Sequence, residues 1–144
     1  TITNRDLFYQ YQFPAVLSKV AVSGRELREL LEENAGYFIS DEGRGLSIAE
    51  KYASKKNSAA FYDLYRGVDY AYDFSQPEGN RLTHLKREGQ DILDDDQFEL
   101  VVNAYGAYAG KNYPEYFEDR LIERKSVEMP DLMSQYIRKY GPLK

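Results

Sequence analysis

The stretch from residue 14 to residue 38 constrains the fold most, because a run of β-forming residues leads directly into a helix start. The β-branched and aliphatic residues of 14–22 favour a strand, with Pro14 at the first strand position, where proline is tolerated. Ser23 precedes Glu26 by three positions, which is the spacing of a helix capping box. Apolar residues then recur at helical spacing: Leu27, Leu30, Leu31, Ala35 and Phe38. The pattern predicts a strand followed at once by an amphipathic helix whose apolar face runs through Phe38.

The other predicted elements mix helices and strands without a regular β-α-β alternation. The sequence predicts a short helix or turn at 4–11, a short helix near 47–53, strands at 68–74 and 81–86, a brief edge strand at 91–93, a central strand at 98–105, an apolar segment at 121–122, and a last helix that begins near Pro130 and is stopped by Gly141. At 144 residues the chain is long enough for one core. We therefore expect a single α+β domain, residues 1–144, with a mixed or antiparallel sheet and packed helices.

Charge and composition narrow the classes of function. The net charge of −5 gives no basic surface for a nucleic acid polymer, whereas a single nucleotide needs only a slot for its ring and a few donors. The absence of cysteine excludes disulfides and thiol catalysis. No run approaches the ~18 to 20 apolar residues of a membrane span. Since the chain begins at Thr1 without an initiator methionine, we expect it to come from a longer precursor, truncated at its N-terminal side.

Two polar features invite a metal or catalytic interpretation. Asp94, Asp95 and Asp96 could bind a hard cation, but consecutive carboxylates point in different directions, so we expect a structural turn. His84 is the single histidine, and it cannot build a histidine-rich metal centre alone. We expect it to be a partly exposed strand residue. The sequence thus predicts no metal site and no catalytic residue in this chain.

The segment from Asn103 to Pro114 has the composition of a loop that can hold a planar ring. Gly106 and Gly110 allow close backbone approach, and Tyr105 supplies a flat face with a polar tip. The alternative is a strand end whose tyrosines close the core over a glycine-rich turn.

Several segments, in their order and spacing, resemble the C-terminal domain of the 5′-nucleotidase family. The likeness is closer to its 2′,3′-cyclic-nucleotide 2′-phosphodiesterase/3′-nucleotidase branch. The segments are 22–32, 67–82, 89–90, 94–98 and 103–114, and the resemblance extends over residues 5–140. Segments 67–82, 94–98 and 103–114 match a pattern that runs from a Gly-Val-x-Tyr strand through Ser-x-Pro-x-Gly-x-Arg and an Asp-Asp-x-Phe/Tyr turn to Asn-x-Tyr-x-Ala-x-x-Gly-x-Asn-Tyr-Pro.

The resemblance implies a division of labour between two domains. In this family an N-terminal metallophosphoesterase domain carries a pair of divalent metal ions, and the C-terminal domain binds the substrate. The resemblance therefore implies a nucleotide or nucleoside ligand, an N-terminal partner domain, no cofactor in this chain, and no hydrolysis by this chain alone. It also implies a bacterial protein that is extracellular, in the cell wall or periplasmic.

The family's substrate site transfers onto a small set of positions. Phe13 and Tyr105 correspond to the aromatic residues that stack on the two faces of the nucleobase, and the accompanying loop residues are Gly106, Gly110, Lys111 and Asn112. Two places differ from the family: Pro14-Ala15 follow Phe13 where an asparagine-bearing pair is usual, and Gly106 follows Tyr105 where an arginine is usual.

A second hypothesis is a non-catalytic interaction domain on a bacterial surface. Tyrosine is enriched at recognition surfaces. The residues of this alternative patch are Tyr9, Tyr11, Tyr108 and Tyr116.

Overall fold

The computed structural model describes residues 3–11, 15–41, 45–56, 58–103, 117 and 119–141. Its elements are α1 (Asn4–Gln10), β1 (Val16–Ser23), α2 (Gly24–Ala35), β2 (Phe38–Asp41), β3 (Gly45–Ile48), α3 (Glu50–Ala53), the 3₁₀ turn η1 (Ser58–Phe61), β4 (Asp69–Tyr72), β5 (Leu82–Arg87), β6 (Gln90–Asp91), β7 (Gln97–Asn103), β8 (Leu121–Glu128) and α5 (Met129–Tyr140). The pairs β1–β8, β2–β3, β4–β5 and β5–β6 are antiparallel. The α+β prediction is confirmed, and the chain divides into two compact units, residues 22–98 and residues 1–21 with 99–144.

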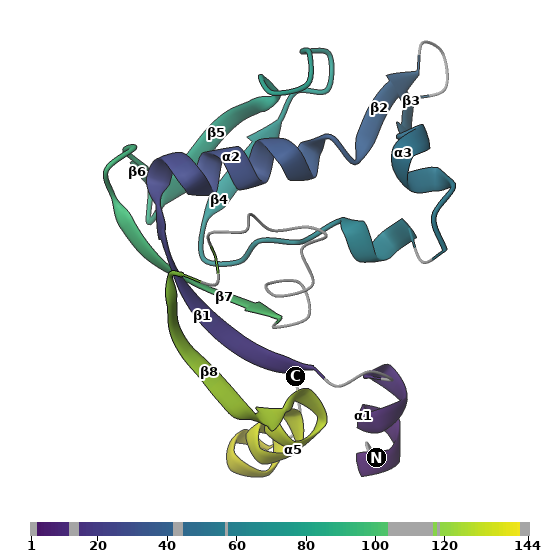
Figure 1. The fold of residues 1–144 in the computed structure, drawn as a ribbon, viewed down its shortest axis with the longest axis vertical. Coiled ribbons are helices and arrows are strands. Elements are labelled where there is room, and N and C mark those ends of the chain that lie inside the picture. Colours follow the sequence, from purple (N-terminus) through teal and green to yellow (C-terminus); the bar gives the residue numbers. More distant parts are fainter. Residues whose placement is uncertain are drawn as a thin grey trace. The chain divides into compact units, whose positions relative to one another are not determined.

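In the unit of residues 22–98, α2 begins at the predicted capping box. The Ser23 N–H donates to the Glu26 carboxylate at 2.8 Å, and the Glu26 N–H donates back to the Ser23 hydroxyl at 3.3 Å. The helix lies against the strands β4 and β5 (Figure 1). Its Leu27 and Leu31 form a buried cluster with Leu85 and Ile92, where each leucine contributes about 1.5–3 kcal/mol by leaving water.

The first residue of α2 packs directly on the backbone of the turn that precedes β7. A Cβ atom at Gly24 would overlap the Leu93 carbonyl oxygen and would lie 2.9 Å from Ile92 Cγ2. The Gly24 N–H donates to the Asp96 carbonyl at 2.8 Å, and the Arg25 N–H donates to the Asp94 carbonyl at 3.1 Å. Only glycine fits between this helix start and the turn.

The other end of α2 is held by one buried cation. Arg81 is 7% exposed, and its guanidinium donates to the carbonyls of Ala35, Phe38 and Gln76. Within the same turn of α2, Glu32 accepts the backbone N–H groups of Arg81 and Leu82 at 3.0 and 2.7 Å. These bonds attach the end of the helix to the start of β5. Each bond also gives a partner to a polar group whose burial without one would cost free energy.

The structure departs from the helix predicted through Phe38. The helix ends at Ala35, and Phe38 starts β2, which pairs with β3 in a hairpin that no sequence pattern predicted. The predicted helix at 47–53 is shorter, since Ser47 belongs to β3 and α3 spans only Glu50–Ala53.

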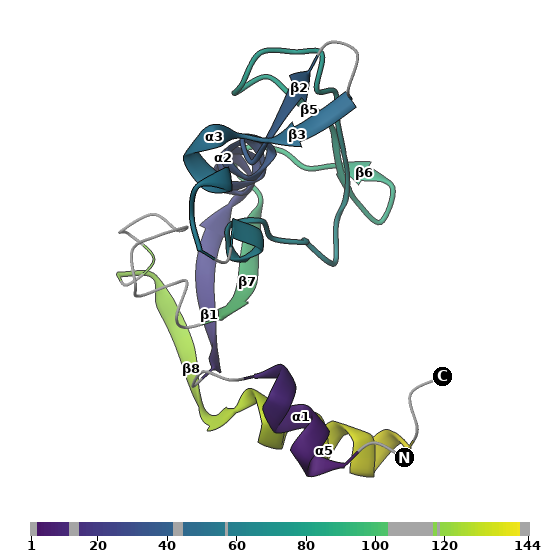
Figure 2. The ribbon, with the colours of Figure 1, turned by 90° about the vertical axis from the view of Figure 1, so that its right-hand side faces the viewer.

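In the unit of residues 1–21 and 99–144, three strands form a sheet in the order β7-β1-β8. The strand predicted as central, 98–105, is β7, and it lies at an edge of the described sheet, so that prediction is wrong. Its partner β1 occupies the centre. The segment predicted only as apolar at 121–122 opens a full strand, β8. Helices α1 and α5 lie side by side (Figure 2), and the Ser134 hydroxyl donates to the Asn4 side-chain oxygen at 3.2 Å.

We expect Gly24→Ala to lower the free energy of unfolding by about 3 kcal/mol, because the added methyl meets a backbone carbonyl that cannot move aside as a side chain would. Urea denaturation of the chain measures this, with Glu29→Ala on the exposed face of α2 as a matched control that should change stability by less than about 0.5 kcal/mol. A Gly24→Ala variant as stable as the control would contradict the close packing.

Candidate functional site

The residues predicted to hold the nucleobase lie outside the described part of the chain. They are Phe13, Tyr105, Gly106, Gly110, Lys111 and Asn112. The base clamp therefore stays a prediction. The strands from which these segments extend are described.

Each of the two predicted clamp segments adjoins, in the sequence, one of two neighbouring strands. Residue 13 precedes β1, which begins at Val16, and residue 105 follows β7, which ends at Asn103. The Gly24 N–H directly after β1 donates to the Asp96 carbonyl directly before β7. Because β7 starts where its neighbour β1 ends, the two strands run in opposite directions (Figure 1). The start of β1 and the end of β7 therefore lie at the same end of the sheet.

One face of this sheet carries a row of paired charges. Lys19 on β1 forms an ion pair with Glu99 on β7 and lies opposite Glu123 on β8, which pairs with Lys125. The hydrogen bond to the Glu99 carboxylate raises the pKa of the Lys19 ammonium. Opposite charges on neighbouring strands support the sheet register rather than offering a free cation to a ligand.

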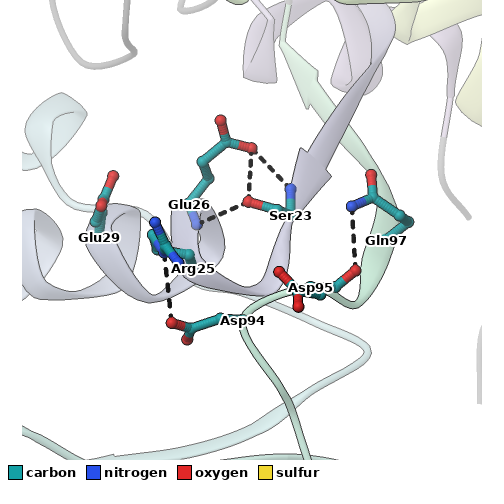
Figure 3. A pocket seen from close by; sticks show the side chains of 7 residues that line it. All are labelled: Ser23, Arg25, Glu26, Glu29, Asp94, Asp95 and Gln97. Carbon is teal, nitrogen blue, oxygen red and sulfur yellow. Dashed lines mark hydrogen bonds and ion pairs between the residues drawn. The ribbon is translucent and has the colours of Figure 1, made fainter.

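A surface pocket of about 350 Å³ lies at the start of α2, in the unit of residues 22–98 (Figure 3). It is lined by Ser23, Arg25, Glu26, Glu29, Asp94, Asp95 and Gln97. The first three N–H groups of the helix are already accepted by the Asp96 carbonyl, the Asp94 carbonyl and the Ser23 hydroxyl. The Arg25 guanidinium contacts the Asp94 carboxylate at 3.4 Å. With its donors engaged and four carboxylates around it, the pocket is not suited to an anion.

The Asp94–Asp96 run is a turn, as predicted. Asp94 faces Arg25 and Arg28, whereas the Asp96 carboxylate accepts the Leu93 N–H at 2.8 Å. Across the described residues, no group of three or more histidine, aspartate or glutamate side chains could hold a metal ion. His84 lies exposed on β5 opposite Ala71, also as predicted.

The alternative tyrosine patch is described only in part. Tyr9 is 68% exposed on α1 and Tyr11 is half-buried. Tyr108 and Tyr116 lie outside the described residues, so the patch also stays a prediction.

The comparisons with known proteins decide the family. The family model described as "5′-nucleotidase, C-terminal domain" matches residues 1–119. This chain belongs to the 5′-nucleotidase C-terminal domain family. The family predicted from the motifs is thereby confirmed.

The relatives include proteins of the predicted branch. The chain is 25% identical to the trifunctional nucleotide phosphoesterase protein YfkN of Bacillus subtilis, over 88% of this chain and 9% of that protein. It is also 25% identical to the 2′,3′-cyclic-nucleotide 2′-phosphodiesterase/3′-nucleotidase of Haemophilus influenzae, over 95% of this chain and 22% of that protein. A candidate 5′-nucleotidase from Staphylococcus aureus, crystallised in complex with α-ketoglutarate, has a similar structure with a TM-score of 0.87 and 27% identity, over 97% of this chain and 27% of that one. The chain thus corresponds to about a quarter or less of each of these proteins.

None of the helices in the described ranges is long and apolar enough to cross a membrane.

We expect inorganic phosphate to leave the amide resonances of Gly24, Arg25 and Glu26 unmoved, since each N–H already has an acceptor. A ¹H–¹⁵N NMR titration of the chain checks this. The control is Ser23→Ala, which removes the acceptor of the Glu26 N–H and should move that resonance before any phosphate is added. Saturable shifts of the three amides in the parent chain would contradict this interpretation of the pocket.

Proposed function

We propose that this chain is the substrate-binding domain of a metal-dependent nucleotide phosphohydrolase and that Phe13 and Tyr105 hold the nucleobase between their rings. The family match carries the proposal, because it spans residues 1–119 and so includes both positions. The names of the relatives, a nucleotide phosphoesterase and a 2′,3′-cyclic-nucleotide 2′-phosphodiesterase/3′-nucleotidase, support a nucleotide as the ligand.

The arrangement of the described strands supports the pairing of these two residues. Strands β1 and β7 are neighbours in one sheet, and the start of β1 lies at the same end of that sheet as the end of β7. Phe13 precedes β1 and Tyr105 follows β7 by a few residues each.

The chemistry of such a clamp suits a hydrolase that accepts several nucleotides. Stacking contributes about 1–3 kcal/mol per base and is tolerant of base identity, because every base has a π-face. Gly106 and Gly110 would allow the loop to approach the ligand, and Lys111 and Asn112 would donate to its ribose or phosphate.

Bond breaking belongs to the rest of the polypeptide in this proposal. A divalent metal pair in an N-terminal metallophosphoesterase domain would align the attacking and leaving oxygens, and this chain would bind and orient the substrate. We propose an extracellular, cell-wall or periplasmic location, on the basis of the family resemblance.

We expect Phe13→Ala and Tyr105→Ala each to weaken adenosine binding to the chain by ~5- to 150-fold, the equivalent of one lost stack. The dissociation constant from an NMR titration measures this effect. Tyr9→Ala is the matched control, since Tyr9 is an exposed tyrosine of the alternative patch, and it should leave binding unchanged. Binding lost in Tyr9→Ala but retained in the other two variants would favour the tyrosine patch.

In the full-length protein, Tyr105→Ala should lower kcat/KM for 3′-AMP by the same ~5- to 150-fold. The value for p-nitrophenyl phosphate, which has no base, should stay nearly constant because the metal centre is untouched. Equal losses on both substrates would show that Tyr105 supports the fold instead of the base.

A further inference from the structure

A second pair of aromatic rings, far from the clamp in the sequence, forms a shelf on the unit of residues 22–98. The Tyr52 ring on α3 and the Phe61 ring at the end of η1 have centroids 5.7 Å apart and planes inclined by 39°. Both side chains are half-buried. Tyr52 also contacts Tyr37, which is 4% exposed, with centroids 5.3 Å apart. The buried Tyr37 fixes the shelf against the core while part of each outer ring stays accessible.

Two lysines, Lys51 and Lys55, lie beside this shelf, in a chain whose net charge is −5. The Lys55 ammonium lies over both rings, 4.3 Å from the Phe61 centroid and 5.5 Å from the Tyr52 centroid. Lys51 is bound to the Glu78 carboxylate at 2.9 Å. By contrast, Lys55 and its neighbour Lys56 are exposed, and neither forms an ion pair with a carboxylate in the part of the chain that the structure describes.

We propose that this shelf is a second nucleotide site, in which the base stacks on Tyr52 and Phe61 and the phosphate pairs with Lys55 and Lys56. Proteins bind a base and its phosphate together with two elements, an aromatic ring for the base and an unpaired cation for the phosphate. The carboxylate nearest to the shelf through its contacts, Glu78, is already bound to Lys51, whereas the α2 pocket is bordered by four carboxylates.

Displacing the Lys55 ammonium from the rings costs little. An exposed cation–π contact changes an equilibrium by a factor of about 2–5, whereas a stacked base contributes about 5- to 150-fold. The displaced ammonium sits on a flexible four-carbon stem and can turn to the phosphate of the same ligand. When the nucleotide binds, the cation–π contact of Lys55 is therefore replaced by a stacked base and by an ion pair between Lys55 and the phosphate.

This site does not depend on the clamp. Tyr52, Lys55 and Phe61 belong to the unit of residues 22–98, whereas Phe13 and Tyr105 belong to the other unit. Residue-resolved binding data therefore separate the two proposals.

The test is a ¹H–¹⁵N NMR titration of the chain with 3′-AMP, adenosine and inorganic phosphate in parallel. We expect 3′-AMP to shift the amides of residues 50–56 and 59–61 and to bind there more tightly than adenosine or phosphate. Phe61→Leu should weaken this binding by ~5- to 150-fold. Lys55→Gln, an exposed change that leaves the rings in place, should remove most of the preference for 3′-AMP over adenosine.

The matched control is Tyr140→Leu on α5, where the Lys139 ammonium also lies over a tyrosine ring, at 4.8 Å. It should leave 3′-AMP binding unchanged. Shifts confined to residues next to 13 and 105 would overturn the second site and leave the clamp intact. Unchanged affinity in both Phe61→Leu and Lys55→Gln would also overturn it, and would show that the Lys55 contact serves only the local fold.

Discussion

The unit of residues 22–98 depends on the contact between the start of α2 and the turn before β7. Gly24 lies against the Leu93 carbonyl, and the turn supplies two carbonyl acceptors to the helix N–H groups. A helix start leaves its first N–H groups without partners inside the helix. Here the chain satisfies them with the Ser23 side chain and with the carbonyls of Asp94 and Asp96, which lie far away in the sequence. The contact therefore fixes the start of α2 and the start of β7. It also holds the end of β1 next to the start of β7, and these are the two strands that lead toward the predicted clamp.

The opposite end of α2 uses a different device, a buried arginine that binds carbonyl groups. Arg81 joins the helix end, the start of β2 and the β4–β5 connection, and the Phe74 ring lies 5.6 Å from its guanidinium carbon. Five donors in a fixed planar arrangement suit arginine to this role, and lysine could not reproduce it. Next to Arg81, the rings of Phe38 and Tyr37, and of Phe38 and Tyr62, pack edge to face, and the rings of Tyr37 and Tyr62 pack at a tilt of 39°. They provide the rigid support for the shelf of Tyr52 and Phe61.

The sequence was most informative where a local pattern carries its own stop and start signals. The capping box at Ser23 and Glu26 predicted the start of α2, and Pro130 and Gly141 marked the two ends of α5. The sequence was misleading where its pattern is ambiguous. Phe38 continues the helical spacing, yet it belongs to a hairpin. Its carbonyl accepts a hydrogen bond from Arg81, a tertiary contact that no local pattern shows.

The strand β8 was not predicted in full because its sequence is rich in charged residues. Its cross-strand partners on β1 stabilise it instead. Apolar content made β7 look central, although Val101 is exposed at a sheet edge. The composition of the loop pointed to Tyr105, but Phe13 could be named only through the family resemblance, since stacking residues have no spacing rule of their own.

We propose that one aromatic residue before β1 and one after β7 hold a nucleobase between them. A crystal structure of the chain with adenosine tests this most directly. We predict the adenine between Phe13 and Tyr105, with the two ring planes about 7 Å apart, twice the usual contact distance of ~3.5 Å. An adenine bound without either ring, or a Phe13 or Tyr105 ring buried in the core, would contradict the account.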